Sequence, residues 1–118
     1  MPEAITVRII DVVGSSLAVS AEDGQAVHDK IAPVMRDGQA VGLSFQGIDT
    51  VISAFLNAAI GQLYGEFPEE KIRELLSVKD MAPEDVALLK RVVDNAKVYF
   101  RDPERFKQVI TEVTGDEE

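Results

Sequence analysis

A strong strand pattern lies at residues 40–45 and reads Ala40-Val41-Gly42-Leu43-Ser44-Phe45. Val41, Leu43 and Phe45 alternate with small residues, so one face of this strand is apolar and the other is almost bare. Such a pattern is typical of a central strand whose small face is covered by a closely packed helix. We therefore expect the other elements to be arranged around residues 40–45.

The segment before this strand predicts a β-hairpin followed by a helix. In the expected first strand, residues 5–12, Ile5, Val7 and Ile9 alternate with Thr6 and Arg8, and a turn sequence at 14–16 precedes a second short strand at 17–19. Ser20 then begins a capping-box pattern with acidic residues in the first turn, which favours a helix. Pro33 interrupts the hydrogen bonding of that helix, so the helix should kink or end near it and be finished at Asp37-Gly38.

The segment after residue 45 predicts a further strand and three helices. Ser53 is placed as the N-cap of a helix that runs to about Tyr64. A strand is expected over residues 73–78, a long helix from Pro83, and a last helix that begins at residues 102–104 and runs to about 113. The element order predicts an α/β fold, a small mixed β-sheet with helices packed on it.

Composition excludes several functional classes. The 118 residues suit one domain, and the absence of cysteine removes disulfides and thiolate chemistry and suits a reducing cytoplasm. Twelve basic and 21 acidic residues give a net charge of −9, which disfavours nucleic acid and anionic membranes as partners. We also expect no membrane insertion, because no apolar run approaches the length of a membrane-spanning helix.

The residues that usually carry catalysis or bind metals are almost missing. His28 is the single histidine, and its charged neighbours predict a partly exposed surface residue rather than a general base. One histidine without cysteine also provides a poor donor set for transition metals. We therefore expect no catalytic residues, no metal site and no cofactor.

A resemblance to a known family is carried by residues 41–57, which read Val-Gly-Leu-Ser-Phe-Gln-Gly-Ile-Asp-Thr-Val-Ile-Ser-Ala-Phe-Leu-Asn. This segment resembles the middle of STAS-like domains, which are related to sulfate-transporter and anti-sigma-factor-antagonist modules. The resemblance extends more weakly from Ile5 to about Phe100. It implies a single STAS-like domain over residues 1–114, followed by an acidic tail at 115–118.

In antagonist members of that family, a serine at the corresponding helix start is phosphorylated by a partner kinase, and the resemblance implies this role for Ser53. Antagonists have Asp-Ser-Ser-Gly where this chain has Ile52-Ser53-Ala54-Phe55, so the acid, the second serine and the glycine are replaced. The residues alone also support a simpler role for Ser53 as a helix cap.

The loop and helix start after the central strand form the candidate partner interface, because they combine apolar residues with a loop. The interface comprises Asp49, Thr50, Val51, Ile52, Ser53, Phe55 and Asn57. We expect a non-catalytic cytosolic protein-interaction module, a signalling regulator whose protein partner is an ATPase-type kinase or a similar protein. The same apolar residues could instead seal the end of the core.

Two other functional classes stay open at this point. Free amides at helix starts near Ser20 or Ser53 could bind a small anionic ligand without catalysis. A stripe of small residues predicts very close helix packing, either inside the fold or between copies in a self-associating homo-oligomer. The stripe comprises Ala54, Ala58, Gly61 and Gly65.

Overall fold

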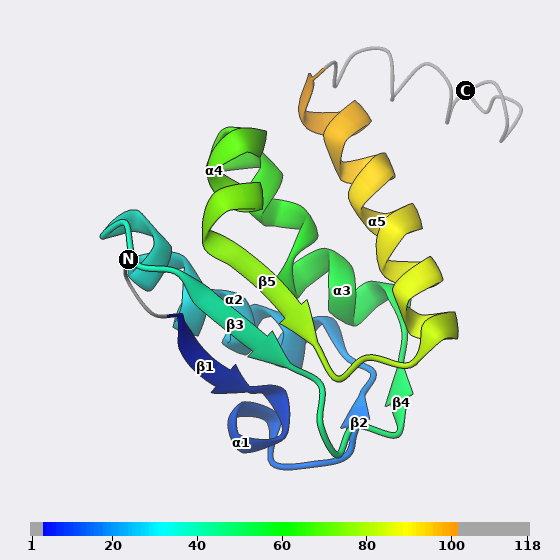
Figure 1. Cartoon of the computed structure of the whole chain (residues 1–118). Coiled ribbons are helices and arrows are strands. Elements are labelled where there is room, and N and C mark those ends of the chain that lie inside the picture. The colour runs from blue at the N-terminus through cyan, green and yellow to red at the C-terminus, as the bar shows by residue number, and fades with distance from the viewer. Residues whose placement is uncertain (1–3, 102–118) are drawn as a thin grey trace, which may run out of the picture.

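The computed structural model describes residues 4–101, and it confirms the α/β class (Figure 1). The elements in chain order are β1 (Ile5–Arg8), α1 (Ile9–Val13), β2 (Leu17–Ala18), α2 (Ala21–Arg36), β3 (Val41–Ser44), β4 (Thr50–Val51), α3 (Ser53–Ala59), the 3-10 helix η1 (Gly61–Gly65), α4 (Glu69–Leu75), β5 (Leu76–Lys79) and α5 (Pro83–Arg101). Within residues 4–101 no helix has the length and apolar character needed to cross a membrane. The predicted last helix and the acidic tail lie outside the described residues.

The main sheet has three strands in the order β1-β3-β5, which confirms the predicted central strand. Both pairings are parallel, with Val41 of β3 opposite Ile5 on one side and Leu76 on the other. Helices α2 and α3 lie behind this sheet in Figure 1 and cover its apolar face. A helix was expected over the small face, but there the Lys79 side chain of β5 lies against Gly42.

The predicted hairpin is wrong. The first strand ends at Arg8 and continues as α1, and β2 pairs in parallel with β4 in a separate two-stranded sheet. Ile9 begins α1 and is fully buried, while Gly14 ends the helix with a left-handed φ of 77°. This single helical turn carries the chain away from β1, so β2 cannot fold back on it.

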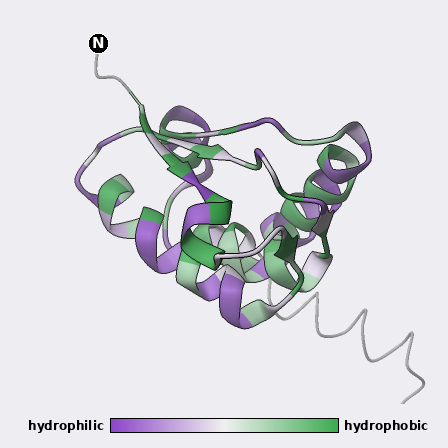
Figure 2. Ribbon diagram, turned by 90° about the horizontal axis from the view of Figure 1, so that it is seen from below, coloured by the Kyte–Doolittle hydropathy of each residue, from purple (hydrophilic) through white to green (hydrophobic). Residues whose placement is uncertain are grey.

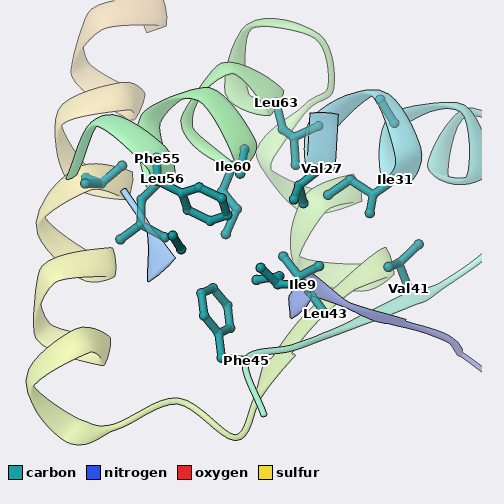
Figure 3. Packing of buried hydrophobic residues seen from close by; sticks show 14 of the residues in the cluster. Ile9, Val27, Ile31, Val41, Leu43, Phe45, Phe55, Leu56, Ile60 and Leu63 are labelled. Atoms are coloured by element: carbon teal, nitrogen blue, oxygen red, sulfur yellow. The ribbon is translucent and has the colours of Figure 1, made fainter. Parts of the chain in front are cut away.

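The core lies between the main sheet and helices α2 and α3. Figure 3 shows Phe55 and Leu56 of α3 gathered with Val27 and Ile31 of α2 and with Leu43 of β3. All five of these side chains are fully buried. The helices themselves are amphipathic, and Figure 2 shows apolar and polar segments alternating along them.

Helix α2 begins as predicted and extends past its proline. The Ser20 hydroxyl accepts a hydrogen bond from the Asp23 amide at 3.0 Å, which is the expected cap. Pro33 lies inside the last turn and is exposed, and the helix continues to Arg36. Asp37 and Gly38 end it, with Gly38 at a φ of 82°.

Helix α3 begins one residue earlier than predicted. Ile52 is the N-cap and Ser53 is the first helical residue, so the prediction of Ser53 as N-cap is wrong. The Ile52 amide donates to the Ala18 carbonyl at 3.2 Å, which prolongs the β2–β4 pairing through residue 52 and keeps it extended. The helix also stops at Ala59 and continues only as the 3-10 turn η1, rather than running unbroken to Tyr64.

Within residues 69–79, the boundary between helix and strand differs from the prediction. A strand was expected over residues 73–78, but Arg73 to Leu75 belong to helix α4 and the strand β5 begins at Leu76. Helix α4 follows Pro68 and has Glu69 and Glu70 in its first turn, a typical helix start. The long helix from Pro83 is confirmed as α5.

Three members of the stripe, Ala58, Gly61 and Gly65, pack against neighbouring helices on two sides of α3 and η1, whereas Ala54 is exposed. Ala58 faces Gly24 of α2, where an added Cβ on Gly24 would lie 2.9 Å from the Ala58 Cβ and would strike the Phe55 carbonyl oxygen. On the other side, Gly61 faces Val92 of α5, and Gly65 lies against the ring of Phe100. Close approach of three helices therefore accounts for these positions.

Replacing Gly24 with alanine tests this packing. In an open helix position the change stabilises a protein by about 1 kcal/mol, because alanine is the better helix former. Here the new methyl group collides with backbone, so we expect the free energy of unfolding to fall by about 1–3 kcal/mol in urea titrations. A more stable Gly24→Ala variant would show that α2 and α3 are not in contact at this point.

Candidate functional site

The small sheet formed by β2 and β4 presents apolar side chains to solvent. Leu17 pairs with Thr50 and Ala18 with Val51, so alternate residues face opposite sides. Ala18 and Val51 point into the core, with 0% and 8% of their surface exposed, whereas Leu17, Val19 and Ile52 are 47%, 39% and 39% exposed. We define the β2–β4 patch as Leu17, Val19, Thr50 and Ile52.

Backbone hydrogen bonds fix the position of this patch. The amide of Asp49 donates to the Ser16 carbonyl at 2.8 Å, and the amide of Ile52 donates to the Ala18 carbonyl at 3.2 Å. Gly47 turns the preceding loop with a φ of 82°. The apolar side chains are therefore held on a hydrogen-bonded ladder and not on a free loop.

The predicted interface is divided by the structure into a surface part and a core part. Asp49, Thr50, Ile52, Ser53 and Asn57 are exposed and lie along β4 and the outer side of α3. By contrast, Val51 and Phe55 are core residues, so in the folded chain their side chains cannot contact a partner. Val51 and Phe55 therefore follow the alternative stated in the sequence analysis, in which the apolar residues seal the end of the core.

Leu17 and Val19 were missed as surface candidates. They had been assigned to the returning strand of a hairpin, where a neighbouring strand would have shared their surface. The signal was nevertheless present, because two apolar residues on either side of Ala18 must share the face opposite to it.

A groove of about 450 Å³ adjoins this surface between α3 and α5. Ser53 and Asn57 of α3 line one side of it, and Arg91 and Asn95 of α5 are among the residues that line the other. The buried side chains of Val92 and Ala96 also line it, together with Gly61, which has no side chain to fill the space. The structure thus brings two of the sequence-predicted residues, Ser53 and Asn57, to a concave site.

His28 is buried, with 6% of its surface exposed, so the prediction of a partly exposed histidine is wrong. Its Nε2 lies 2.8 Å from Glu66 Oε1, beyond η1, and its Nδ1 lies 3.1 Å from Asp29 Oδ1. The hydrogen bond with His28 is the main cause that lowers the pKa of Asp29. Both ring nitrogens are engaged, and the cluster ties α2 to the chain after η1.

A second ionic contact ties α4 to α5. Lys97 lies 2.8 Å from Glu69, and Arg73 lies 2.6 Å from the same carboxylate oxygen. The neighbouring ammonium of Lys97 lowers the pKa of Glu69. Among residues 4–101, no set of three or more histidine and carboxylate side chains is arranged to hold a metal ion.

Comparison with protein families gives one match. A family model described as a STAS-like domain of unknown function (DUF4325) matches residues 23–86, more than half of the chain. The chain therefore belongs to this STAS-like family, which confirms the resemblance found in the sequence. No curated protein and no solved structure matches the chain.

The role of His28 can be tested by removing its hydrogen bonds while keeping its bulk. We expect His28→Leu to lower the free energy of unfolding by about 1–3 kcal/mol, because Glu66 loses its hydrogen bond with His28 at a partly buried position and keeps only the longer contact with Arg36 at 3.7 Å. Glu66→Gln retains a hydrogen-bonding side chain and should cost less than His28→Leu. Equal stability of His28→Leu and the parent chain in urea unfolding would contradict a structural role for this cluster.

Proposed function

We propose that this chain is a non-catalytic protein-interaction module of the cytosol, and that it binds a signalling protein through the β2–β4 patch and the adjoining start of α3. The observation that carries the proposal is the exposure of Leu17, Val19 and Ile52 on one side of a hydrogen-bonded ladder. Apolar side chains that gather in this way on a soluble domain are often contact sites for another protein.

The position of the patch supports protein recognition. Its strands are short and rigidly paired, so a partner would meet a preformed surface and lose little conformational entropy on binding. Thr50 lies within the patch, and exposed Asp49 and Ser53 lie beside it in the sequence, so polar groups adjoin its apolar residues. An apolar centre with a polar rim is the usual anatomy of a protein interface.

Charge favours a particular kind of partner. The chain has a net charge of −9, and Asp49 lies next to the patch. This negative charge would attract a basic partner surface over long range and help to orient it. Together with membership of a STAS-like family, this leads us to propose an ATPase-type kinase or a related signalling protein as the partner.

Ser53 is suited to regulate that contact by phosphorylation. Its side chain is exposed and does not cap α3, so its hydroxyl is accessible to a kinase. The first turn of α3 has no acidic residue that would repel a phosphate. Phosphorylation would add about −1.5 to −2 charges beside Ile52 and weaken an apolar contact there.

Anion binding at the other helix start, near Ser20, is less well supported. The Ser20 hydroxyl is already bonded to the Asp23 amide at 3.0 Å. Glu22 and Asp23 also occupy the first turn of α2, where their negative charges oppose an incoming anion.

The proposal predicts that charge placed on the patch abolishes partner capture. Tagged parent chain, Ile52→Asp and Ser53→Glu are compared in pull-downs from native cytosol, and the captured protein is then purified and its affinity measured by calorimetry. We expect both variants to weaken binding by at least about tenfold, because they introduce an uncompensated charge into an apolar contact.

Val98→Asp is the matched control, because Val98 is 44% exposed but lies on α5 outside the patch. This variant should bind the partner like the parent chain. Equal binding by all three variants and the parent would exclude the patch as the interface. Intact-mass measurement of the endogenous chain, with peptide mapping to Ser53, tests phosphorylation separately.

A further inference from the structure

The groove between α3 and α5 combines an apolar base with polar side chains, among them those of Ser53, Asn57, Arg91 and Asn95. Its base is formed by Val92 and Ala96, which are 4% and 7% exposed, and by the backbone of Gly61. An added Cβ on Gly61 would lie 3.2 Å from Asn57 Oδ1, 3.7 Å from Val92 Cγ1 and 3.8 Å from the Ala96 Cβ. The absence of a side chain at residue 61 therefore leaves room at the base of the groove.

Four of the polar side chains that line the groove are uncommitted, whereas Gln62, which also lines it, donates hydrogen bonds to Gln25 and to the Ala58 carbonyl. Ser53, Asn57, Arg91 and Asn95 make no side-chain hydrogen bond or ion pair with any other residue of the range 4–101. Other cations of α5 differ, since Lys90 pairs with Asp94 at 3.4 Å and Lys97 with Glu69 at 2.8 Å. A guanidinium, a hydroxyl and two carboxamides that converge on a groove are a set of groups that can orient a ligand.

The charge of the groove specifies the charge of its ligand. Arg91 is the one charged residue among those of the described chain that line it. A guanidinium binds a carboxylate with two parallel hydrogen bonds, and one guanidinium balances one negative charge. A phosphate monoester would bring a second negative charge, which a chain with a net charge of −9 leaves uncompensated.

The size and base of the groove specify the rest of the ligand. A volume of about 450 Å³ falls within the range typical of small-molecule sites. The apolar base can cover a hydrocarbon or aromatic body, and Phe100, which also lines the groove, adds an aromatic surface. We propose that this groove binds a small organic monocarboxylate, with the carboxylate on Arg91 and the apolar body over Val92 and Ala96.

This site differs from the partner surface proposed above and does not depend on it. Ser53 borders both, but Arg91, which pairs with the carboxylate, lies on α5, and the β2–β4 patch contributes no residue to the groove. Failure of either proposal therefore leaves the other standing.

The test is an NMR titration of the ¹⁵N-labelled full chain with decanoate and with phenylbutyrate, each at millimolar concentration. Decanol and phenylbutanol serve as uncharged counterparts, and inorganic phosphate serves as an anion without an apolar body. We expect saturable shifts of the Asn57, Gly61, Arg91 and Asn95 amides with at least one carboxylate. The matching alcohol should bind about tenfold more weakly, because it lacks the charge-assisted pair.

Arg91→Gln should weaken carboxylate binding by about tenfold, whereas Lys90→Gln, the neighbouring cation that does not line the groove, should bind like the parent chain. Gly61→Ala should also weaken it, because the methyl group occupies the base of the groove. Lys90 and Arg91 are both exposed on α5, so neither substitution should disturb the fold. The amide spectrum of each variant checks this.

Three results would overturn the proposal. The first is that neither carboxylate shifts the groove amides at millimolar concentration. The second is that Arg91→Gln binds as well as Lys90→Gln, and the third is that phosphate or the alcohols bind at least as tightly as the carboxylates. Shifts spread over residues outside the groove would count as the first of these results.

Discussion

The close contact of helices α2 and α3 at Gly24 is the constraint on which the rest of the structure depends. Without a side chain at residue 24, the backbone of α2 reaches the Phe55 carbonyl and the Ala58 methyl group of α3. This approach lets Phe55 and Leu56 enter the core beside Val27 and Ile31, under the apolar face of the sheet. A larger residue would separate the two helices, and this layer of the core would lose its close packing.

The position of α3 then creates both surfaces discussed above. On its N-terminal side, the chain leaves β4 still paired with β2, so Ile52 and Ser53 emerge on the surface beside Leu17 and Val19. On its far side, the small residues of η1 admit α5, and Gly61 leaves the groove open. One short helix with small residues on two sides therefore carries the proposed protein-contact surface and the proposed ligand groove.

Sequence patterns were reliable where one periodicity was uninterrupted. The alternation at residues 41–45 and the helical spacing after Pro83 gave the central strand and α5, and Ser20 gave the start of α2. They failed where two periodicities meet, because Ile9 begins a helix inside an apparent strand and the strand predicted over residues 73–78 is helical up to Leu75. Local pattern does not reveal which tertiary contact will decide such a junction.

The candidate site was predictable only in part for a related reason. Exposed Ile52 and Ser53 were found in the sequence, but Val51 and Phe55 were assigned to the same surface, since burial depends on which face of β4 and α3 meets the core. Leu17 and Val19 were missed because their true partner strand, β4, lies more than thirty residues away. Arg91 and Asn95 join the groove only through the packing of α5 on α3, and His28 meets Glu66 only because α2 and η1 adjoin.

The most direct test of this account is a nuclear Overhauser measurement on the labelled chain in solution. The α-protons of Gly24 and the methyl protons of Ala58 belong to different helices, and a Cβ added to Gly24 would lie only 2.9 Å from the Ala58 Cβ. We predict a strong cross-peak between them, because the Overhauser effect is seen only between protons that are close in space. Its absence, with both resonances assigned, would contradict the contact of α2 and α3 and with it the placement of both surfaces.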